Sequence, residues 1–297
     1  MNDLLAALAV RPLLCDGAMG TQLFARGLGS GECGMLWNKE RAELVRSVHE
    51  AYRQAGCNLI TTNTFGGTAY ALGLHGTDTA ERMAELNRAG AQVAREVANN
   101  SAWVLGDVGP FGDFLEPLGD MEADELRSMF RAQIAALADG GVDAILIETM
   151  SDPAEMEIAL RAAKEATSLP VLATYAFQKS SDGTFRTMMG NTVEATIERV
   201  VAAGADIVGS NCGVELSFPD YLELARQIVR AAGKTPVILQ PNAGSPQIVD
   251  GETRYNATPD EMAAIVKPLL DIGVRIVGGC CGTSPALLAA MSRKITC

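Results

Sequence analysis

Two adjacent cysteines, Cys280 and Cys281, stand in the segment Gly-Gly-Cys-Cys-Gly-Thr at positions 278–283, and a third, Cys212, precedes Gly213. Successive side chains of a regular strand point to opposite faces, so adjacent cysteines can share one metal only where the backbone leaves strand geometry. The flanking glycines allow that departure. Three thiolates leave one position of a tetrahedral Zn2+ open, as in catalytic rather than structural zinc sites. The pattern therefore predicts a zinc centre at Cys212, Cys280 and Cys281.

The open position of such a centre could take a substrate sulfur. A free alkyl thiol is mostly protonated at neutral pH, whereas coordination to Zn2+ removes the proton and preserves a usable nucleophile. Soft thiolate ligands also favour zinc over hard cations such as Mg2+. The spacing of these three cysteines is not one of the common zinc motifs, so the alternative is that they are small buried apolar residues. We interpret Cys15 and Cys57 in that way, because a lone cysteine in a core strand is usually such a residue.

Composition excludes several classes of protein. The 297 residues include seven cysteines, an odd number that argues against complete disulfide pairing and for reduced thiols. The formal net charge of -12 repels phosphodiester backbones and anionic membrane surfaces, so neither nucleic acid nor a membrane is an expected partner. The first apolar stretch has no basic residues before it, and no run of about 18 apolar residues occurs. We expect a cytoplasmic protein.

Eight short apolar segments alternate with segments of helical length. Most are apolar on both alternations, as strands buried on both faces of a parallel sheet should be. Eight such units favour an α/β fold with a single (β/α)8 TIM barrel over an open doubly wound sheet. No low-complexity linker divides the chain, so residues 1–297 are predicted to form one domain. The predicted strands are 13–15, 59–64, 103–107, 144–148, 171–175, 207–211, 237–240 and 274–278.

Helix starts follow several of these strands. The segment 257–272 is predicted to form one helix, because Thr258 and Glu261 make a capping box and Gly273 marks the end. A proline at the first helical position opens two more predicted helices, 154–166 after Asp152 and 286–291 after Ser284. Four long segments are predicted to be irregular loops on the active face of the barrel: 27–37, 109–120, 178–190 and 242–256.

Polar residues gather where the predicted strands end. In a TIM barrel the chemistry lies at the C-terminal rim of the strands, so these residues are expected to converge in space. Besides the three cysteines they are Asp16, Asn63, Thr64, Asp107, Glu148, Thr149, Asn211, Gln240 and Asn242. Asp16 could instead be a turn residue before Gly17, and Glu148 a charge at the N-terminal end of a helix.

From about residue 13 to residue 291 the chain resembles the homocysteine S-methyltransferase family in six ordered motifs. They are Asp-Gly-Ala-Met-Gly-Thr-Gln at 16–22, Thr-Asn-Thr-Phe at 62–65, Glu-Thr at 148–149, Asn-Cys at 211–212, Pro-Asn-Ala-Gly at 241–244 and Gly-Gly-Cys-Cys-Gly-Thr at 278–283. The resemblance implies a (β/α)8 barrel in which Cys212, Cys280 and Cys281 bind zinc and activate the thiol of homocysteine or a related small thiol.

The resemblance also implies roles for residues outside the metal centre. Asp16 and Glu148 would hold the amino group of homocysteine, and a carboxylate pair suits this task because it accepts charge-assisted hydrogen bonds from an ammonium. Gly17 and Asn63, which lie in two of the motifs, are assigned to the same substrate pocket. Asn242 would occupy the fourth zinc position when substrate is absent.

Branches of the family differ in methyl donor. Gly282 after the cysteine pair and the Pro-Asn-Ala-Gly segment resemble the homocysteine domain of cobalamin-dependent methionine synthase, whereas users of S-methylmethionine more often carry Arg at that position. The chain has no Asp-x-His-x-x-Gly corrinoid-binding motif. We therefore expect methylation of homocysteine to methionine, with methylcobalamin supplied by a separate corrinoid protein.

Several alternatives stay open at this point. The donor could be a small free molecule such as S-methylmethionine, S-adenosylmethionine or betaine, or the chain could be a thiol-binding barrel without catalysis. An unrelated barrel lyase or aldolase would need a Schiff-base lysine at a strand end, and Lys179 in a polar loop is the nearest candidate. Acid-base chemistry by histidine has weak support, because His49 and His75 lie in or near predicted helices.

Overall fold

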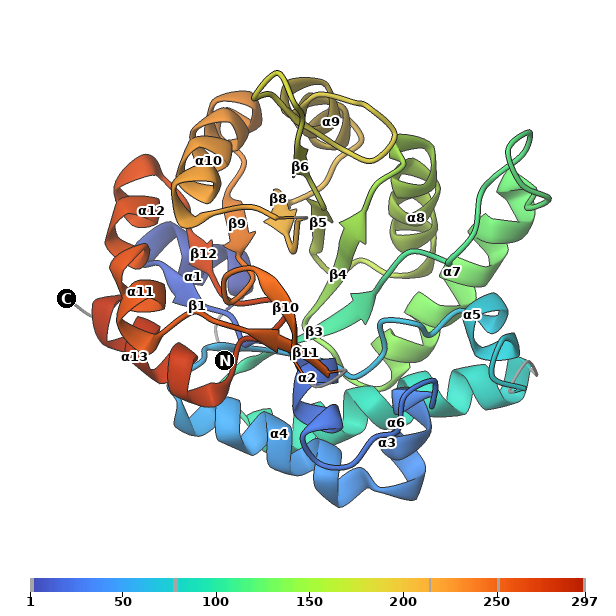
Figure 1. The fold of residues 1–297 in the computed structure, drawn as a ribbon. Helices are drawn as coiled ribbons and strands as arrows, with labels where there is room; N and C mark the ends of the chain where they lie inside the picture. Colours follow the sequence, from blue (N-terminus) through green and yellow to red (C-terminus); the bar gives the residue numbers. More distant parts are fainter. Residues whose placement is uncertain (1–2, 77–79, 214, 250–251, 296–297) are drawn as a thin grey trace.

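The computed structural model describes residues 3–76, 80–213, 215–249 and 252–295. The remaining residues of the predicted domain 1–297, Cys297 among them, lie outside the described residues. Eight parallel strands in the order β1-β12-β9-β8-β5-β4-β3-β2 form the centre, with helices around them (Figure 1). A parallel bridge between Cys15 and Leu59 links the two ends of this sheet. The predicted α/β class and single (β/α)8 TIM barrel are thereby confirmed.

Each of the eight predicted strand segments overlaps one strand of the barrel, and β3 and β4 run one and two residues past the predicted ends. The strands are β1 (Leu13–Leu14), β2 (Leu59–Thr61), β3 (Trp103–Val108), β4 (Ala144–Met150), β5 (Val171–Tyr175), β8 (Ile207–Asn211), β9 (Val237–Gln240) and β12 (Ile276–Val277). Adjacent strands pair in parallel, for example Leu59 with Trp103 and Asn211 with Gln240. Parallel pairing brings the C-terminal ends of all eight strands to one end of the barrel.

Alternation along the strands sorts the apolar side chains into two layers. Trp103 and Leu105 of β3 pack with Leu59 and Leu146 of the neighbouring strands in a cluster inside the barrel. The intervening residues, such as Val104, belong to the larger cluster between the strands and the outer helices. A parallel sheet covered on both faces requires this pattern, which explains why the strand segments read as continuously apolar.

Helix α1 (Leu4–Val10) covers the N-terminal end of the barrel. Its Leu4 and Leu8 join the apolar cluster inside the strands, and Asp3 caps the helix by accepting a hydrogen bond from the backbone N–H of Leu5. The guanidinium of Arg275, just before β12, donates to the backbone carbonyl of Leu8. One end of the barrel is therefore filled by apolar packing, and the opposite end carries the polar strand ends.

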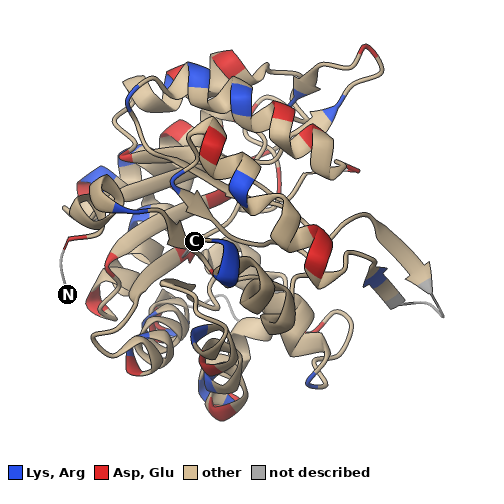
Figure 2. Cartoon of the chain, turned by 90° about the vertical axis from the view of Figure 1, so that its left-hand side faces the viewer, with Lys and Arg blue, Asp and Glu red and all other residues tan. Residues whose placement is uncertain are grey.

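Along the outer helices, acidic and basic side chains are interspersed (Figure 2). Within the described residues, no helix combines the length and apolar character needed to cross a bilayer. The long helices of the ring are α4 (Ala42–Gln54), α6 (Ala80–Ala98), α7 (Ala123–Asp139), α8 (Pro153–Ala166), α9 (Val193–Ala202), α10 (Phe218–Ala232) and α13 (Pro285–Ile295). Shorter helices near β1 and β2 are α2 (Met19–Phe24), η1 (Gly34–Leu36), α3 (Trp37–Glu40) and α5 (Ala69–Gly73).

The helix predicted over 257–272 is two helices, α11 (Pro259–Ala264) and α12 (Val266–Ile272). The predicted capping box of Thr258 and Glu261 and the left-handed Gly273 at the end are both confirmed. The break follows from Pro268, which has no N–H to donate to the carbonyl of Ala264, so the helical ladder is interrupted there. The last helix also runs past the predicted 286–291, to Ile295.

Two segments predicted to be irregular loops contain antiparallel hairpins instead. The segment 178–190 holds β6 (Gln178–Lys179) and β7 (Phe185–Arg186), and the segment 242–256 holds β10 (Pro246–Val249) and β11 (Glu252–Tyr255), whose turn lies outside the described residues. Strands this short carry too few residues to show an alternation that sequence could reveal. Both hairpins follow barrel strands and lie at the C-terminal end of the barrel, as the prediction of long active-face segments requires.

Close approach of β8 and β9 gives a test of the barrel. Gly209 of β8 pairs with Ile238, and a Cβ atom at position 209 would lie 1.8 Å from the Ile238 carbonyl oxygen. Gly209→Ala should therefore lower the free energy of unfolding by about 3 kcal/mol, measured by urea unfolding. Gly20→Ala is the matched control, because a Cβ there meets nothing within 4 Å. Equal stability of the two variants would contradict the described pairing.

Candidate active site

The three cysteines predicted to bind metal come together at the C-terminal end of the barrel. Cys212 follows β8, whereas Cys280 and Cys281 follow β12. Their sulfur atoms all lie within 4.8 Å of one another, and the sulfurs of Cys212 and Cys281 are 3.8 Å apart. Two sulfurs on one tetrahedral zinc, each at about 2.3 Å from it, lie about 3.8 Å apart, so the described spacing fits a shared metal ion.

The backbone turns sharply at Cys212 to present its sulfur. Cys212 has a φ of 57° and Gly213 a φ of 103°, so two successive residues adopt left-handed conformations. A left-handed conformation is unusual for a residue other than glycine and is maintained only where surrounding contacts enforce it. The Tyr221 hydroxyl of α10 provides one such contact, because it donates to the Cys212 carbonyl at 2.6 Å and accepts from the Asn242 N–H at 3.2 Å.

The cysteine pair lies where β12 has ended, as the flanking glycines predicted. The backbone N–H of Cys280 donates to the carbonyl of Pro241, and the carbonyl of Cys281 accepts from Ala243. Gly282 then has a φ of 77°, and a Cβ there would lie 2.1 Å from the ring of Tyr255 of β11. Glycine at 282 is therefore needed both for its conformation and for the packing of the β10–β11 hairpin against the cysteines.

Hydrogen bonds among the three thiols shift their pKa values in different directions. Donation from Cys212 and Cys280, and from the Tyr255 hydroxyl, lowers the pKa of Cys281 to about 3. Hydrogen bonding to Cys212 and Cys281, together with burial, raises the pKa of Cys280. A soft cation that displaces the thiol protons would gain three anionic ligands.

Polar side chains replace the apolar ones in the last layer of the barrel interior. Each polar residue lies on the face of its strand whose earlier residues point into the barrel. On β3, for example, Asp107 follows the inward-pointing Trp103 and Leu105. An apolar interior that becomes polar toward one end creates a pocket for a polar ligand at that end. The residues of this layer are Thr61, Asp107, Glu148, Thr174, Asn211 and Gln240.

Asp16 is held rigidly beside this layer. Its carboxylate accepts hydrogen bonds from the backbone N–H and the hydroxyl of Thr61, both at 2.8 Å, and from the thiol of Cys15 at 3.6 Å. Burial nevertheless raises the pKa of Asp16 to about 7, although the hydrogen bonds from Thr61 oppose the rise. A carboxylate so deeply buried gains from a cationic ligand.

Glu148 is aimed by an irregularity in β4. The pairing of β4 with β5 shifts between Ile147 and Met150, and Thr149 has a φ of 61°, which is an outlier for a β-branched residue. The side chain of Asn211 stabilises this turn by accepting from the Thr149 N–H and donating to its hydroxyl, and it also approaches the sulfur of Cys280 at 3.8 Å. Burial, with the charges of Asp16 and Cys281, raises the pKa of Glu148 to about 8.

The other residues assigned to the substrate pocket lie around the same end of the barrel. Gly17 allows close packing of the two ends of the chain, because a Cβ there would lie 2.4 Å from Oγ1 of Thr283. The amide group of Asn63 donates to the Gly34 carbonyl and to Asn38, so it braces the segment that follows β1.

Asn242 adjoins the thiol cluster. Its Nδ2 donates to the Gly213 carbonyl at 3.0 Å, and its side chain forms a hydrogen bond with Cys212. Its buried Oδ1 has no hydrogen-bond partner among the described residues. An unpartnered buried oxygen on a side chain that contacts one thiol of the cluster is suited to approach a metal ion there.

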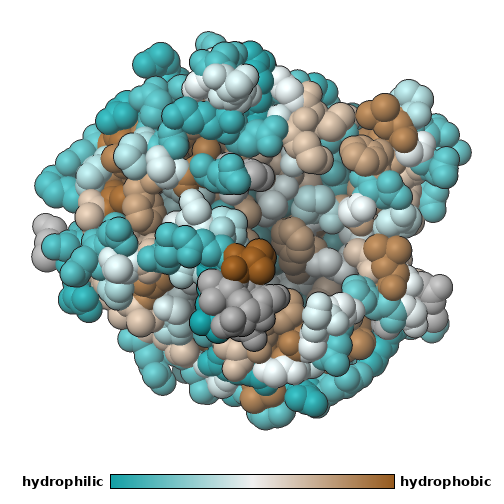
Figure 3. Space-filling view, in the orientation of Figure 1, coloured by the Kyte–Doolittle hydropathy of each residue, from teal (hydrophilic) through white to brown (hydrophobic). Residues whose placement is uncertain are grey.

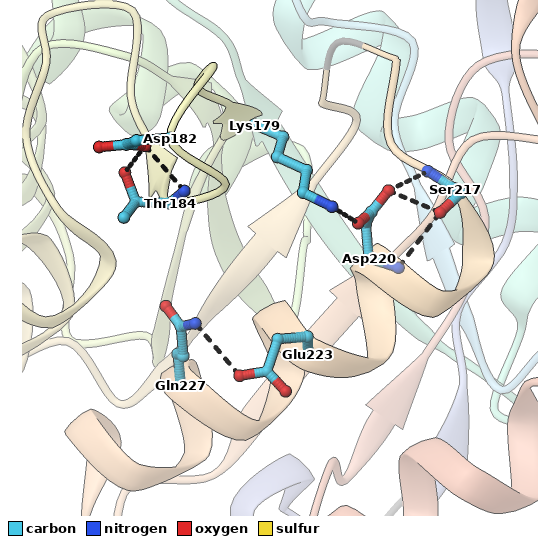
Figure 4. A network of polar contacts seen from close by, with 7 residues as sticks. All are labelled: Lys179, Asp182, Thr184, Ser217, Asp220, Glu223 and Gln227. Atoms are coloured by element: carbon cyan, nitrogen blue, oxygen red, sulfur yellow. Dashed lines mark hydrogen bonds and ion pairs between the residues drawn. The ribbon is translucent and has the colours of Figure 1, made fainter.

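The β6–β7 hairpin is tied to the start of α10 (Figure 4). Nζ of Lys179 lies 2.6 Å from the carboxylate of Asp220, which in turn accepts from the N–H and hydroxyl of Ser217 in a capping box. This network anchors the segment that leads from Cys212 into α10. Lys179 is thus engaged in a partly exposed ion pair, which disfavours the alternative of a Schiff-base lysine.

The histidines do not contribute to this site. His49 is fully buried in α4, and burial lowers its pKa to about 4. His75 lies beyond α5 on an exposed turn. Acid-base chemistry by histidine therefore has no place at the described end of the barrel.

Sequence reasoning gave no role to several residues that shape the site. Asp107 and Asn211 are polar strand ends in the sequence, and each is in phase with apolar residues that point into the barrel, which is the signal that it points inside too. Thr61 and Tyr221 carried no local signal, because their roles depend on partners that are far away in the sequence, Asp16 and Cys212.

The raised pKa of Glu148 predicts how stability depends on pH. An acid whose pKa rises on folding contributes its full stability below its unfolded pKa, and this contribution is lost as the pH rises through the folded value of about 8. Relative to Glu148→Gln, the free energy of unfolding of the metal-free wild type should therefore fall between about pH 5 and 8, by at most roughly 1.4 kcal/mol per pH unit. Urea unfolding at several pH values measures this difference, and parallel pH curves for the two proteins would contradict it.

Comparison with known proteins agrees with this geometry. Residues 13–295 match a family model described as homocysteine S-methyltransferase. Methionine synthase from Mycobacterium tuberculosis is 34% identical over 99% of this chain and 25% of the relative, and methionine synthase from Mycobacterium leprae is 33% identical over 96% and 24%. The chain thus spans about a quarter of the length of these curated relatives.

A solved structure shows the same fold. The metallated form of the homocysteine methyltransferase MmuM from Escherichia coli matches with a TM-score of 0.78 and 23% identity, covering 99% of this chain and all of that chain. Because the family model extends over nearly the whole sequence, the chain belongs to the homocysteine S-methyltransferase family.

Proposed function

We propose that this chain is a zinc-dependent methyltransferase that transfers a methyl group to the thiol of homocysteine and so forms methionine. The observation that carries the proposal is the group of three cysteine sulfurs within 4.8 Å of one another, at the same end of the barrel as the carboxylates of Asp16, which is buried, and Glu148, which is partly buried. Thiolates suit a soft metal that binds sulfur, and carboxylates suit an ammonium. Homocysteine carries a thiol and an ammonium on one short chain.

Cys212, Cys280 and Cys281 would hold the zinc ion, and Asn242 would contact it when no substrate is present. When bound, zinc supplies a lowered pKa for the substrate thiol, so that the sulfur is nucleophilic at neutral pH. The unpartnered Oδ1 of Asn242 supports its role. Because an amide oxygen is a weaker ligand for zinc than a thiolate, substrate sulfur can replace it.

Asp16 and Glu148 would bind the ammonium of homocysteine through charge-assisted hydrogen bonds. Asp16 is buried and Glu148 is partly buried, and both have raised pKa values, so a cationic partner stabilises them more than it would at the surface. Gly17 and Asn63 would shape the pocket around the amino acid. Holding the ammonium while the sulfur lies at the cysteines orients the nucleophile for attack. The sulfur–methyl bond then forms as the methyl–donor bond breaks, and the electron pair of that bond leaves with the donor.

The donor we propose is methylcobalamin carried by a separate corrinoid protein. Support comes from the apolar rim, which we define as the exposed side chains of Phe65, Phe114, Leu118, Met188 and Ile248. These residues follow β2, β3, β5 and β9, and Figure 3 shows apolar side chains at several separate points around the hollow at this end of the barrel, with more hydrophilic residues between them. Exposed apolar groups gathered on one face mark a site of macromolecular contact, which a small free donor would not need. A cytoplasmic location suits the free thiols of the centre.

Zinc binding should require all three cysteines of the centre. Titration of the metal-free protein against a chromophoric chelator should show about one zinc per chain. Cys212→Ser, Cys280→Ser and Cys281→Ser should each lose most of the affinity, because a hydroxyl is a poor ligand for this metal. The control is Cys33→Ser, since Cys33 is a half-buried thiol outside the centre. Retention of zinc by all three site variants would contradict the proposal.

Methyl transfer should depend on the apolar rim only when a protein carries the donor. Zinc-loaded chain with homocysteine should form methionine from a methyl-corrinoid protein and from free methylcobalamin. Leu118→Asp with Ile248→Asp should raise the KM for the carrier protein and leave transfer from free methylcobalamin unchanged. Val10→Asp is the control, because Val10 is exposed at the opposite end of the barrel.

Other outcomes of the same assay would replace parts of the proposal. Methionine formed only from S-methylmethionine, S-adenosylmethionine or betaine would identify a small free donor. Homocysteine binding without methionine from any of these donors would identify a thiol-binding barrel that has no methyltransferase activity.

A further inference from the structure

The carboxylate of Asp107 lacks the partner that its burial requires. The residue is 5% exposed, and its Oδ1 forms no hydrogen bond within the described part of the chain. Burial, and then the charges of Glu148 and Asp16, raise the pKa of Asp107. The charged groups that act on it are thus both acidic. Buried carboxylates normally have hydrogen-bond donors or a cation as partners, so this one is suited to a ligand that supplies them.

Asp107 lies between the two carboxylates already assigned to the substrate ammonium. Asp16 is held by Thr61 of β2, Asp107 belongs to β3 and Glu148 to β4, and these strands are consecutive in the barrel. Thr61 pairs with Leu105, which is two residues before Asp107. Asp107 in turn pairs with Leu146, which is two residues before Glu148. Neighbouring strands are about 4.8 Å apart, so one small cation inside the barrel can contact all three carboxylates.

A second buried acceptor lies in the same polar layer, on β9, which is across the barrel from β3. Oε1 of Gln240 has no hydrogen-bond partner among the described residues, and its Nε2 lies 3.8 Å from the sulfur of Cys15. That thiol in turn donates to Asp16 at 3.6 Å. Two unpartnered acceptors in one polar layer, Asp107 and Gln240, point to a ligand with several N–H or O–H donors.

A primary ammonium has three N–H donors, and two carboxylates leave one of these donors without an anionic acceptor. We propose that Asp107 is the third acceptor of this pocket, so that Asp16, Asp107 and Glu148 each receive one N–H of the substrate's primary ammonium. The inference rests on the proposed function and extends it to the specificity of the site. An N-methylated or N-acylated amino acid leaves one buried carboxylate unpaired and is therefore rejected.

The test compares homocysteine with 4-mercaptobutanoate, which has the same thiol and carboxylate but no amino group. Isothermal titration of the zinc-loaded full chain should show that the wild type prefers homocysteine. Asp107→Asn should weaken homocysteine binding by roughly tenfold to hundredfold and leave 4-mercaptobutanoate binding unchanged. The matched control is Asp113→Asn, which removes the same charge from an exposed position after the same strand and should change neither affinity.

Each other outcome overturns the inference in a distinguishable way. Unchanged homocysteine affinity in Asp107→Asn would show that Asp107 does not contact the ammonium. Equal weakening of both thiols would show a general structural role, and Asp107→Ala, checked by urea unfolding, separates that result from a failure to fold. Absence of binding of either thiol by the wild type would overturn the proposed function, and the inference with it.

Discussion

The three cysteines meet because the backbone hydrogen bonds of the barrel continue past the ends of β8, β9 and β12. Cys212 donates to the carbonyl of Gln240, Cys280 donates to that of Pro241, and Cys281 accepts from the N–H of Ala243. Residues 69 positions apart in the sequence, Cys212 and Cys281, are thereby held with their sulfurs 3.8 Å from each other. The centre is a product of barrel closure rather than of a local motif, which is why its spacing resembles no common zinc sequence.

The same closure places carboxyl groups inside the barrel. The inner wall is apolar near α1 and polar at the cysteine end, where burial raises the pKa values of Asp16 and Glu148 to about 7 and about 8. No cationic partner of these two groups is found among the described residues, so a positively charged ligand would supply the first. Binding of a cationic ligand should therefore stabilise the folded protein, because the ligand supplies hydrogen-bond donors and a positive charge that the fold does not provide at this site.

Sequence reasoning was reliable wherever one signal determined the structure. Continuously apolar segments between helices predicted eight strands and the barrel, and glycines around the cysteine pair predicted its departure from strand geometry. The break between α11 and α12 has a signal in Pro268, but the strong capping box at Thr258 favours one long helix and outweighs that signal in the sequence. Other features depend on distant contacts and had no local signal. The left-handed Thr149 needs Asn211, and the missing partner of Asp107 appears only when the strands are assembled.

The most direct test of the central claim is X-ray absorption at the zinc edge of the zinc-loaded chain, recorded with and without homocysteine. The account predicts three sulfur ligands and one lighter ligand in the free protein, with sulfur at about 2.3 Å. Saturating homocysteine should replace the lighter ligand and give a shell of sulfur alone. A shell that stays unchanged when homocysteine is bound, or one with fewer than three sulfurs in the free protein, would contradict a thiol-activating centre at these cysteines.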